Sequence, residues 1–244
     1  MENINENPLR VGNFTSSEIV ALTKTGKGED FGQVAKTYIQ ECNFERKLGR
    51  PISEEINSKP LVWGKLLEKR AFDLLGIEYV LSSQDTIKHP VLEYWCGSPD
   101  GIKVENGVKT VIDIKCPFTL KSFCQLYECN TIIDLIKNHK DGEKYYWQLV
   151  SNAILTDSNF AELIVYMPYK SELEDIREMA QNYDGNQNKL SWINWATDEE
   201  LPHLIDGGFY KNIHIIKFSV NNTDTEFLIN RVIEAKKLLI DYAK

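Results

Sequence analysis

The stretch CGSPDGIKVENGVKTVIDIKCPFT, Cys96–Thr119, decides how this sequence folds. Asn106-Gly107 lies between two short runs rich in β-branched residues, and this dipeptide is the strongest short-range signal for a β-hairpin. Side chains alternate between the two faces of a strand, so Asp113 and Lys115 project from one face together. The hairpin therefore places an acid and a base side by side at the end of its second strand.

A second carboxylate comes from the bend that precedes the hairpin. The bend Pro99-Asp100-Gly101 brings Asp100 toward the end of the sheet that carries Asp113. A buried lysine beside two acids is costly unless a ligand there needs these charges. Carboxylate oxygens and a strand carbonyl, such as that of Ile114, suit Mg²⁺ or Mn²⁺, which leaves Lys115 to hold or deprotonate a water. Taken singly, these residues also fit an ordinary turn and an exposed strand face.

Two helical segments supply further polar side chains. Residues 59–76, KPLVWGKLLEKRAFDLLG, have a helical period of apolar residues that ends at a glycine typical of a C-terminal cap. Glu68 lies one turn beyond Gly64, so a carboxylate stands beside a notch that admits a bulky substrate. A later helix, residues 142–156, carries Gln148, which could orient a water or a phosphate oxygen. Alone, Glu68 is typical of a solvated helix charge and Gln148 is uninformative.

The order of elements around these segments is that of an α+β protein. We expect a helix to begin near Ser16, where Glu18 completes a capping box, and a second helix around Val34–Cys42. The predicted strands span residues 77–83, 91–104, 108–116, 159–169 and 212–220, and a terminal helix spans 225–244. The expected fold class is α+β, in which helices flank a central mixed β-sheet that contains the hairpin meander.

Length and composition restrict the class of protein. With 244 residues, 42% hydrophobic and 26% charged, the chain is expected to form one domain, residues 1–244. No apolar run approaches the length of a membrane helix, and the N-terminus lacks a secretory pattern, so we expect no membrane contact and a cytoplasmic location. The five cysteines include no CxxC pair, which argues against a disulfide framework and against structural zinc.

The net charge of −8 is unevenly distributed. Residues 171–206 contain nine acidic and two basic residues, and we interpret them as an acidic insertion or lid. The rest of the chain is therefore close to neutral, so a locally basic groove for a polyanion is compatible with the total. The same numbers also fit charges that are spread over solvated faces.

Taken together, the motifs resemble a known family. Glu68, Asp100, Asp113-Ile114-Lys115 and Gln148 stand in the order of the metal site of PD-(D/E)XK nucleases. The stretches WGKLLE, CGSPDG, DIKCPFT and YYWQ, with RVGNFTSSEI upstream, are similar to the lambda-exonuclease branch, the YqaJ-like viral recombinases. The similarity covers roughly residues 8 to 170 and implies a restriction-endonuclease-like core.

The resemblance implies a metal site with separate roles for its side chains. Asp100 and Asp113 would be metal ligands, and Glu68 a further carboxylate for the metal region. Lys115 would activate the water, while Gln148 would orient the water or the phosphate. Asp113 stands where relatives often have Glu, which shortens its reach by one methylene group.

The resemblance also implies a site for the 5′-terminal phosphate of DNA. Arg10 and Ser17, with Thr15 and Lys27, stand where the family binds this phosphate. Leu61 falls near the position that wedges open the duplex end. Without the resemblance, Arg10 would be read as an ordinary surface charge, although an arginine near a helix N-terminus is a sensible anion site.

The function implied by this resemblance is that of a Mg²⁺-dependent 5′-to-3′ exonuclease, with Mn²⁺ able to substitute. Its substrate would be linear double-stranded DNA, and its 3′ overhangs would serve a single-strand annealing protein in phage-type homologous recombination. The host cytoplasm is the expected location if the gene is phage-encoded. Family members often form ring-shaped trimers, so a homotrimer is an expectation. We also expect an alkaline pH optimum for a reaction assisted by a lysine.

Two alternatives to an exonuclease remain open from the sequence. An endonuclease of the same superfamily would use the same metal site. A catalytically inactive DNA-binding module on this fold would be expected to have lost one of the acids or the lysine, and all are present. An iron–sulfur nuclease would need a four-cysteine cluster near the termini, whereas the last cysteine here is Cys129.

Overall fold

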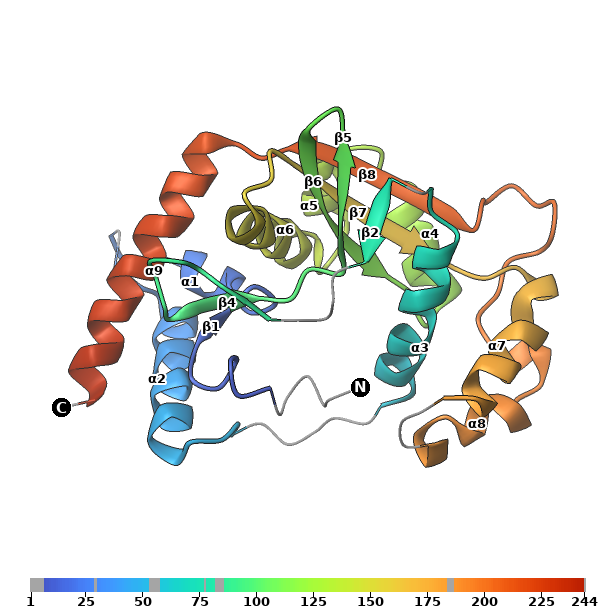
Figure 1. The fold of residues 1–244 in the computed structure, drawn as a ribbon, viewed down its shortest axis with the longest axis horizontal. Helices are drawn as coiled ribbons and strands as arrows, with labels where there is room; N and C mark the ends of the chain where they lie inside the picture. The colour runs from blue at the N-terminus through green and yellow to red at the C-terminus, as the bar shows by residue number, and fades with distance from the viewer. Residues whose placement is uncertain are drawn as a thin grey trace.

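The protein contains two β-sheets, and one helix packs against both (Figure 1). The computed structural model describes residues 7–28, 30–52, 58–76, 78–81, 86–183 and 187–243. One sheet has five strands in the order β2-β5-β6-β7-β8, and the other has three in the order β1-β4-β3. Helix α6 (Gly142–Thr156) contacts strands of both sheets. The predicted α+β class is confirmed, and no helix in these residues is long and apolar enough to cross a bilayer.

The predicted hairpin is the centre of the five-stranded sheet. Strands β5 (Gly101–Glu105) and β6 (Val108–Lys115) pair antiparallel, and Asn106 and Gly107 between them have φ values of 52° and 79°. Positive φ at both positions is what a type I′ turn requires. β6 also pairs in parallel with β7, while the outer strands are antiparallel to their neighbours. The other strands are β2 (Tyr79–Leu81), β7 (Phe160–Tyr166) and β8 (Ile213–Ser219).

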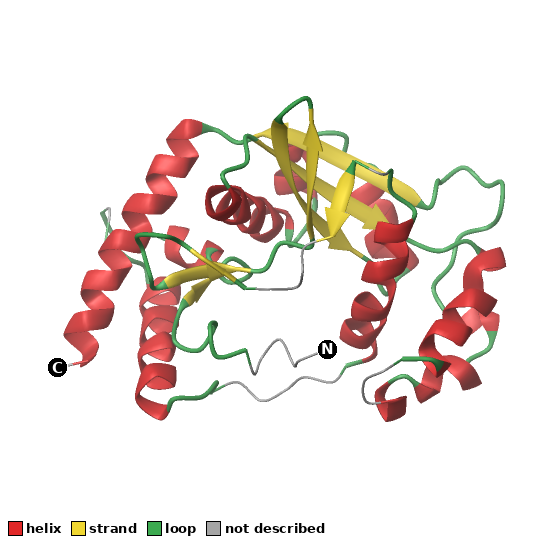
Figure 2. Cartoon of the chain, in the orientation of Figure 1, coloured by secondary structure: helices red, strands yellow, loops and turns green. Residues whose placement is uncertain are grey.

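Different helices cover the two faces of this sheet (Figure 2). Val111 of β6 packs in one apolar core with Leu149 of α6, whereas its neighbour Ile112 packs in another with Trp63 of α3 (Lys59–Asp73). The predicted alternation along β6 is therefore confirmed, and it assigns Asp113 to the α6 face. Two helices that the sequence did not predict complete this face: α4 (Leu120–Tyr127) and α5 (Ile132–Asn138).

The predicted strand 91–104 is wrong, because it is divided between the two sheets. β4 (Trp95–Gly97) belongs to the three-stranded sheet, where it pairs with β1 (Phe14–Thr15) and β3 (Ile87–Lys88). Gly97 is required at the close approach to α6, since a Cβ there would collide with Ser16 and Asn152. The chain leaves β4 at Gly97 and enters β5 at Gly101, so Asp100 lies at the junction of the two sheets.

The helix expected to begin near Ser16 begins four residues later. Ser16 N–H donates to the carbonyl of Cys96 beside the β1–β4 pair, and its hydroxyl lies 2.7 Å from that of Ser151. These long-range bonds use the groups that would have capped a helix, so residues 16–19 form turns. The helices packed around this sheet are α1 (Val20–Thr23), α2 (Gln33–Leu48) and α9 (Asn222–Ala243).

The acidic segment 171–206 is largely helical and packs beside α3. Its buried side chains include Leu173, Ile176 and Ile193, which share a core with Trp63. Arg70 of α3 also forms ion pairs with Glu172 and Asp175 of this segment, at 3.3 and 3.0 Å. Its acidic residue Asp184 lies outside the described residues. The elements are η2 (Lys170–Glu172), α7 (Leu173–Gln181), η3 (Gln187–Lys189), α8 (Ser191–Trp195) and η4 (Asp198–Glu200).

The remaining helix predictions differ mainly at their ends. α2 begins at Gln33, close to the expected Val34, but continues to Leu48. α3 ends at Asp73 and is followed by Leu74 as its C-cap, so the expected cap at Gly76 is wrong. α6 has the predicted bounds, and the terminal helix α9 begins three residues before Thr225.

Candidate active site

A buried carboxylate at the end of β6 contacts a lysine and a glutamine. Asp113 is 1% exposed, and its Oδ2 lies 2.6 Å from Nζ of Lys115. Gln148 of α6 donates a 2.7 Å hydrogen bond from Nε2 to the other oxygen, Oδ1. Within the described residues, Oδ2 accepts no hydrogen bond of good geometry, so its contact with Lys115 is mainly one of charge. The structure therefore brings three of the predicted site residues into direct contact.

Asp100 is fixed to the same strand from the junction between the sheets. Its Oδ2 accepts a 2.6 Å hydrogen bond from the backbone N–H of Ile114, and its own N–H donates to the carbonyl of Ile112. The N–H and C=O of one strand residue point to the same edge. The carbonyl of Ile114 therefore faces the edge of β6 at which Asp100 lies, as a backbone metal ligand would need.

Glu68 belongs to α3, which packs on the opposite face of the sheet, and its charge interacts with those of Asp113 and Lys115. Leu61, Gly64 and Glu68 are spaced by three and four residues, so they form one stripe along this helix. A Cβ built on Gly64 would meet only the backbone oxygen of Cys116, at 4.0 Å, so the predicted notch is open. Cys116 directly follows Lys115, and the notch therefore lies beside the end of β6. Leu61, the predicted wedge, is 44% exposed in the first turn of α3.

The charges at the end of β6 perturb one another. Burial, followed by the charge of Asp113, raises the pKa of Glu68 to about 7, although Lys115 and Lys65 act in the opposite direction. Burial and the charges of Asp113 and Glu68 also raise the pKa of Asp100 well above its usual range. Burial by itself would lower the pKa of Lys115, but Asp113 and Asp100 more than offset it and raise that pKa. Three acids thus compete for one ammonium group.

The donor set fits a hard divalent cation in its chemistry. Three carboxylates and a strand carbonyl are the oxygen ligands that Mg²⁺ and Mn²⁺ prefer. The raised pKa values of Glu68 and Asp100 are those of an acidic cluster that a cation would neutralise. In the described residues, no three His, Cys, Asp or Glu side chains form a ready-made cage. Asp113 and Asp100 instead use oxygens for Lys115, Gln148 and the backbone of Ile114.

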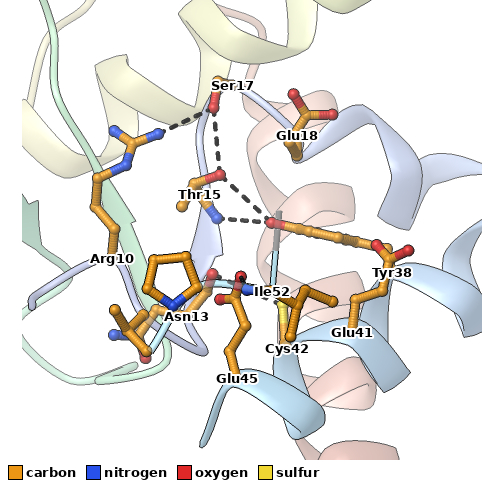
Figure 3. A pocket seen from close by; sticks show the side chains of 12 residues that line it. Arg10, Asn13, Thr15, Ser17, Glu18, Tyr38, Glu41, Cys42, Glu45 and Ile52 are labelled. Carbon is orange, nitrogen blue, oxygen red and sulfur yellow. Dashed lines mark hydrogen bonds between the residues drawn. The ribbon is translucent and has the colours of Figure 1, made fainter. Parts of the chain in front are cut away.

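A pocket of about 520 Å³ lies beside the three-stranded sheet (Figure 3). Arg10 enters it and donates hydrogen bonds to the hydroxyls of Ser17, at 3.2 Å, and Ser98, at 3.3 Å. Ser17 lies 3.3 Å from the hydroxyl of Thr15, whose backbone N–H donates to the hydroxyl of Tyr38. One guanidinium and several hydroxyls that face a pocket can bind an oxyanion.

The surroundings of this pocket differ from two expectations. Arg10 lies among hydroxyls and not at a helix N-terminus, because α1 begins only at Val20. Lys27 is exposed in the loop after α1 and does not line the pocket, so the structure does not group it with Arg10. Carboxylates also line the pocket, and those drawn in Figure 3 are Glu18, Glu41 and Glu45.

Two neighbours of the site were not singled out from the sequence. Ser98 bonds Arg10 and stands two residues before Asp100, so it links the pocket to the acidic cluster along the chain. Tyr145 lies under Lys115, with Nζ 5.2 Å from the centre of its ring. Both had a sequence signal: Ser98 belongs to the CGSPDG motif, and Tyr145 stands one helical turn before Gln148.

Comparison with known proteins shows similarity of structure alone. No protein-family profile and no curated protein sequence matches the chain. The alkaline exonuclease LHK-Exo from Laribacter hongkongensis has a TM-score of 0.60 at 17% sequence identity, over 96% of this chain and 91% of its own. LHK-Exo in complex with dAMP gives the same TM-score and sequence identity, over 97% of this chain and 92% of its own. A phage-related exonuclease from Haemophilus somnus 129PT has a TM-score of 0.60 at 15% sequence identity, over 95% of this chain and 93% of its own.

These similarities extend over nearly the whole length of each chain. The protein therefore has the fold of these exonucleases, a mixed α+β nuclease fold. At 15–17% identity the likeness establishes the fold and leaves the activity to be argued from the site.

Proposed function

We propose that the protein is a metal-dependent deoxyribonuclease that degrades linear double-stranded DNA from its 5′ ends. The observation that carries this proposal is the 2.6 Å contact of Lys115 with the buried carboxylate of Asp113, beside Asp100, which bonds the backbone of Ile114. The charge of Glu68 acts on the same groups. Three ionised carboxylates exceed one ammonium by two negative charges, which one divalent cation would neutralise. The shared fold with two exonucleases supports the same class of reaction.

Asp100, Asp113 and the carbonyl of Ile114 would hold Mg²⁺ or Mn²⁺, with Glu68 as a further carboxylate. A divalent cation in this position would neutralise the phosphate oxygens and lower the pKa of a bound water. Lys115 would donate a hydrogen bond to the attacking water and stabilise the hydroxide that forms. Its 2.6 Å contact with Asp113 holds the amine at the end of β6, where it can make this hydrogen bond. Gln148 fixes Asp113 and would orient the water or a phosphate oxygen.

The Arg10 pocket would hold the 5′-terminal phosphate. Arg10, Thr15 and Ser17 present a charge and hydroxyls, and Ser98 connects them to Asp100. An end-binding pocket near the acidic cluster favours cleavage from a terminus over cleavage within a duplex. Leu61, exposed on the stripe that leads to Glu68, would contact the opened end of the duplex. Lys27 lies outside the pocket and has no part in this proposal.

The products of such an enzyme would be nucleotides and a duplex with 3′ single-stranded overhangs. A single-strand annealing protein could use these overhangs in phage-type homologous recombination. A ring-shaped homotrimer would keep the enzyme on its substrate while it degrades one strand. Both are proposals that rest on the family resemblance.

One digestion experiment tests cation, end and polarity together. Plasmid DNA is supplied as closed circles, as 5′-phosphorylated linear DNA and as 5′-hydroxyl linear DNA, each with Mg²⁺, Mn²⁺ or EDTA. We expect release of nucleotides from 5′-phosphorylated linear DNA with either cation and none with EDTA. Label at the 5′ end should be released before label at the 3′ end.

Other outcomes separate the alternatives. Cleavage of closed circles would identify an endonuclease. Binding of DNA without cleavage under all metal conditions would identify an inactive DNA-binding module. Cleavage that persists in EDTA would contradict the metal site.

A further inference from the structure

Tyr145 gives Lys115 a second neighbour besides the carboxylate of Asp113. Nζ of Lys115 lies 2.6 Å from Asp113 Oδ2 and 5.2 Å from the centre of the Tyr145 ring. An ammonium within about 6 Å of an aromatic face is attracted by the electron density of the ring. Tyr145 and Gln148 are three residues apart on α6, so one helix face contacts both members of the Lys115–Asp113 pair.

His139 supports the ring of Tyr145. The two rings stack with centroids 5.7 Å apart and planes inclined by 22°. His139 is 5% exposed, and its Nδ1 accepts a hydrogen bond from the backbone N–H of Asp141. Its proton therefore lies on Nε2, which is buried and has no partner among the described residues. Burial lowers the pKa of His139, so a neutral ring stands behind Tyr145 and does not repel Lys115.

We propose that Tyr145 is a positioning residue for Lys115, and that His139 holds the Tyr145 ring in place. This inference rests on the proposed function, because it gives Tyr145 a task in the reaction assigned to Lys115. A lysine side chain has four rotatable carbon–carbon bonds, and that of Lys115 is 23% exposed. Contact with Asp113 alone would therefore leave the side chain free to adopt other rotamers. The aromatic face of Tyr145 restricts these rotamers and keeps Nζ of Lys115 beside the acidic cluster.

The role requires the aromatic face and not the hydroxyl, which makes the substitutions informative. Tyr145→Phe keeps the ring, and kcat should stay within about threefold of the wild type. Tyr145→Leu keeps an apolar side chain without a ring, and kcat should fall about 10- to 100-fold with KM nearly unchanged. Tyr94→Leu is the matched control, since Tyr94 packs under Arg46 at 4.0 Å and belongs to the core around Phe14 and Trp95, which is separate from the cores on either face of β6. Its kcat should not change.

His139 is tested by the same logic. His139→Phe preserves a flat ring behind Tyr145 and should keep kcat close to that of the wild type. His139→Ala should lower kcat several-fold, by less than Tyr145→Leu. Equal losses in Tyr145→Phe and Tyr145→Leu would overturn the proposal in favour of direct contact by the hydroxyl. A loss confined to KM would overturn it in favour of DNA binding.

A spectroscopic readout tests the contact independently of any cleavage. Lysines are reductively dimethylated with ¹³C-formaldehyde and a cyanoborohydride reductant, which keeps their charge, and the Lys115 signal is identified by its loss in Lys115→Arg. Ring current from Tyr145 should shift this signal upfield in the wild type and in Tyr145→Phe, and the shift should vanish in Tyr145→Leu. An unshifted signal in the wild type would overturn the placement. If the wild type shows the shift but cleaves no DNA, the proposed function fails while the contact stands.

Discussion

Gln148 Nε2 donates a 2.7 Å hydrogen bond to Asp113 Oδ1, while the other oxygen of this carboxylate faces Lys115. Asp113 is almost completely buried, so these two neighbours set the direction of its carboxylate. A charged group in this position needs both neighbours, because water cannot replace them. The amide of Gln148 therefore helps to orient Asp113, the proposed metal ligand.

Gln148→Leu should lower activity by about 10- to 100-fold, since the carboxylate of Asp113 loses its orienting donor. The dependence of cleavage on Mg²⁺ concentration should move to higher concentrations, which a titration of initial rate against Mg²⁺ would measure. Gln125→Leu, on the exposed side of α4, is the control and should leave both quantities unchanged. An unchanged Mg²⁺ dependence in Gln148→Leu would show that this hydrogen bond does not matter for the metal.

Lys115→Ala should abolish cleavage, by roughly 10²- to 10⁴-fold, and leave Mg²⁺-independent DNA binding intact. It should also lower the free energy of unfolding in EDTA by about 3 kcal/mol, since Asp113 becomes a buried charge without its partner. The double variant Lys115→Ala with Asp113→Asn should recover much of that stability but no activity. Urea denaturation and digestion of labelled duplex measure the two effects separately. Cleavage by Lys115→Ala at the wild-type rate would remove Lys115 from the reaction.

Glu68 should make the metal-free protein less stable as the pH rises. Burial raises its folded-state pKa to about 7, above the ordinary value of 4.5, so between these values the folded state binds a proton that the unfolded state has lost. The free energy of unfolding should therefore fall between about pH 4.5 and 7 and level off above, by roughly 1–2 kcal/mol after allowance for partial solvent exposure. Thermal unfolding in EDTA across this range measures the slope.

Glu68→Gln should reduce that slope without abolishing it, because the raised pKa of Asp100 contributes a slope of the same sign, whereas Glu93→Gln, at an exposed position, should leave the slope unchanged. Mg²⁺ should stabilise the wild type more at pH 8 than at pH 5.5, because the acids must be ionised to hold it. A slope that is the same in the wild type and in Glu68→Gln would place this carboxylate outside the charged cluster.

The part of the site that was predictable depends on short-range rules. Asn106-Gly107 fixes the register of the hairpin, and alternation along β6 then gives the face of Asp113 and Lys115 without further knowledge. Helical spacing likewise relates Glu68 to Gly64. Such rules hold because they depend on backbone geometry within a few residues, which the rest of the fold did not override here.

The part that was missed depends on contacts between distant segments. Ser16 looks like a helix cap, but its N–H and hydroxyl bond to Cys96 and Ser151, far along the chain. The division of residues 91–104 between two sheets likewise follows from the pairing of β4 with β1, which local propensity does not contain. Arg10 meets Ser98 for the same reason. Spacing in the sequence gives no measure of such distances.

Trp192 should prove to be a structural anchor of the acidic segment. Its ring packs against those of Trp63 and Phe118, with centroids 6.3 and 5.7 Å apart. Trp192→Ala should lower the free energy of unfolding by about 3 kcal/mol, since it opens a cavity beside α3. Trp195→Ala, in the same short helix but 85% exposed, should change it by less than about 0.5 kcal/mol. Equal stability of the two variants would mean that the segment contributes little to the folded core.

Substitutions of Arg10 and Lys27 compare a cation that lines the proposed phosphate pocket with an exposed cation outside it. Arg10→Ala should lower the rate on 5′-phosphorylated linear DNA by about 10-fold or more and leave the slower rate on 5′-hydroxyl DNA almost unchanged, because Arg10 and its partner Ser17 line the pocket. Lys27→Ala, outside the pocket and exposed, should alter neither rate by more than about twofold. Initial rates on the two substrates, measured at several salt concentrations, distinguish end recognition from general attraction to DNA. If Arg10→Ala slows both substrates equally, or if Lys27→Ala reproduces its preference, the pocket is not the site that recognises the 5′ phosphate.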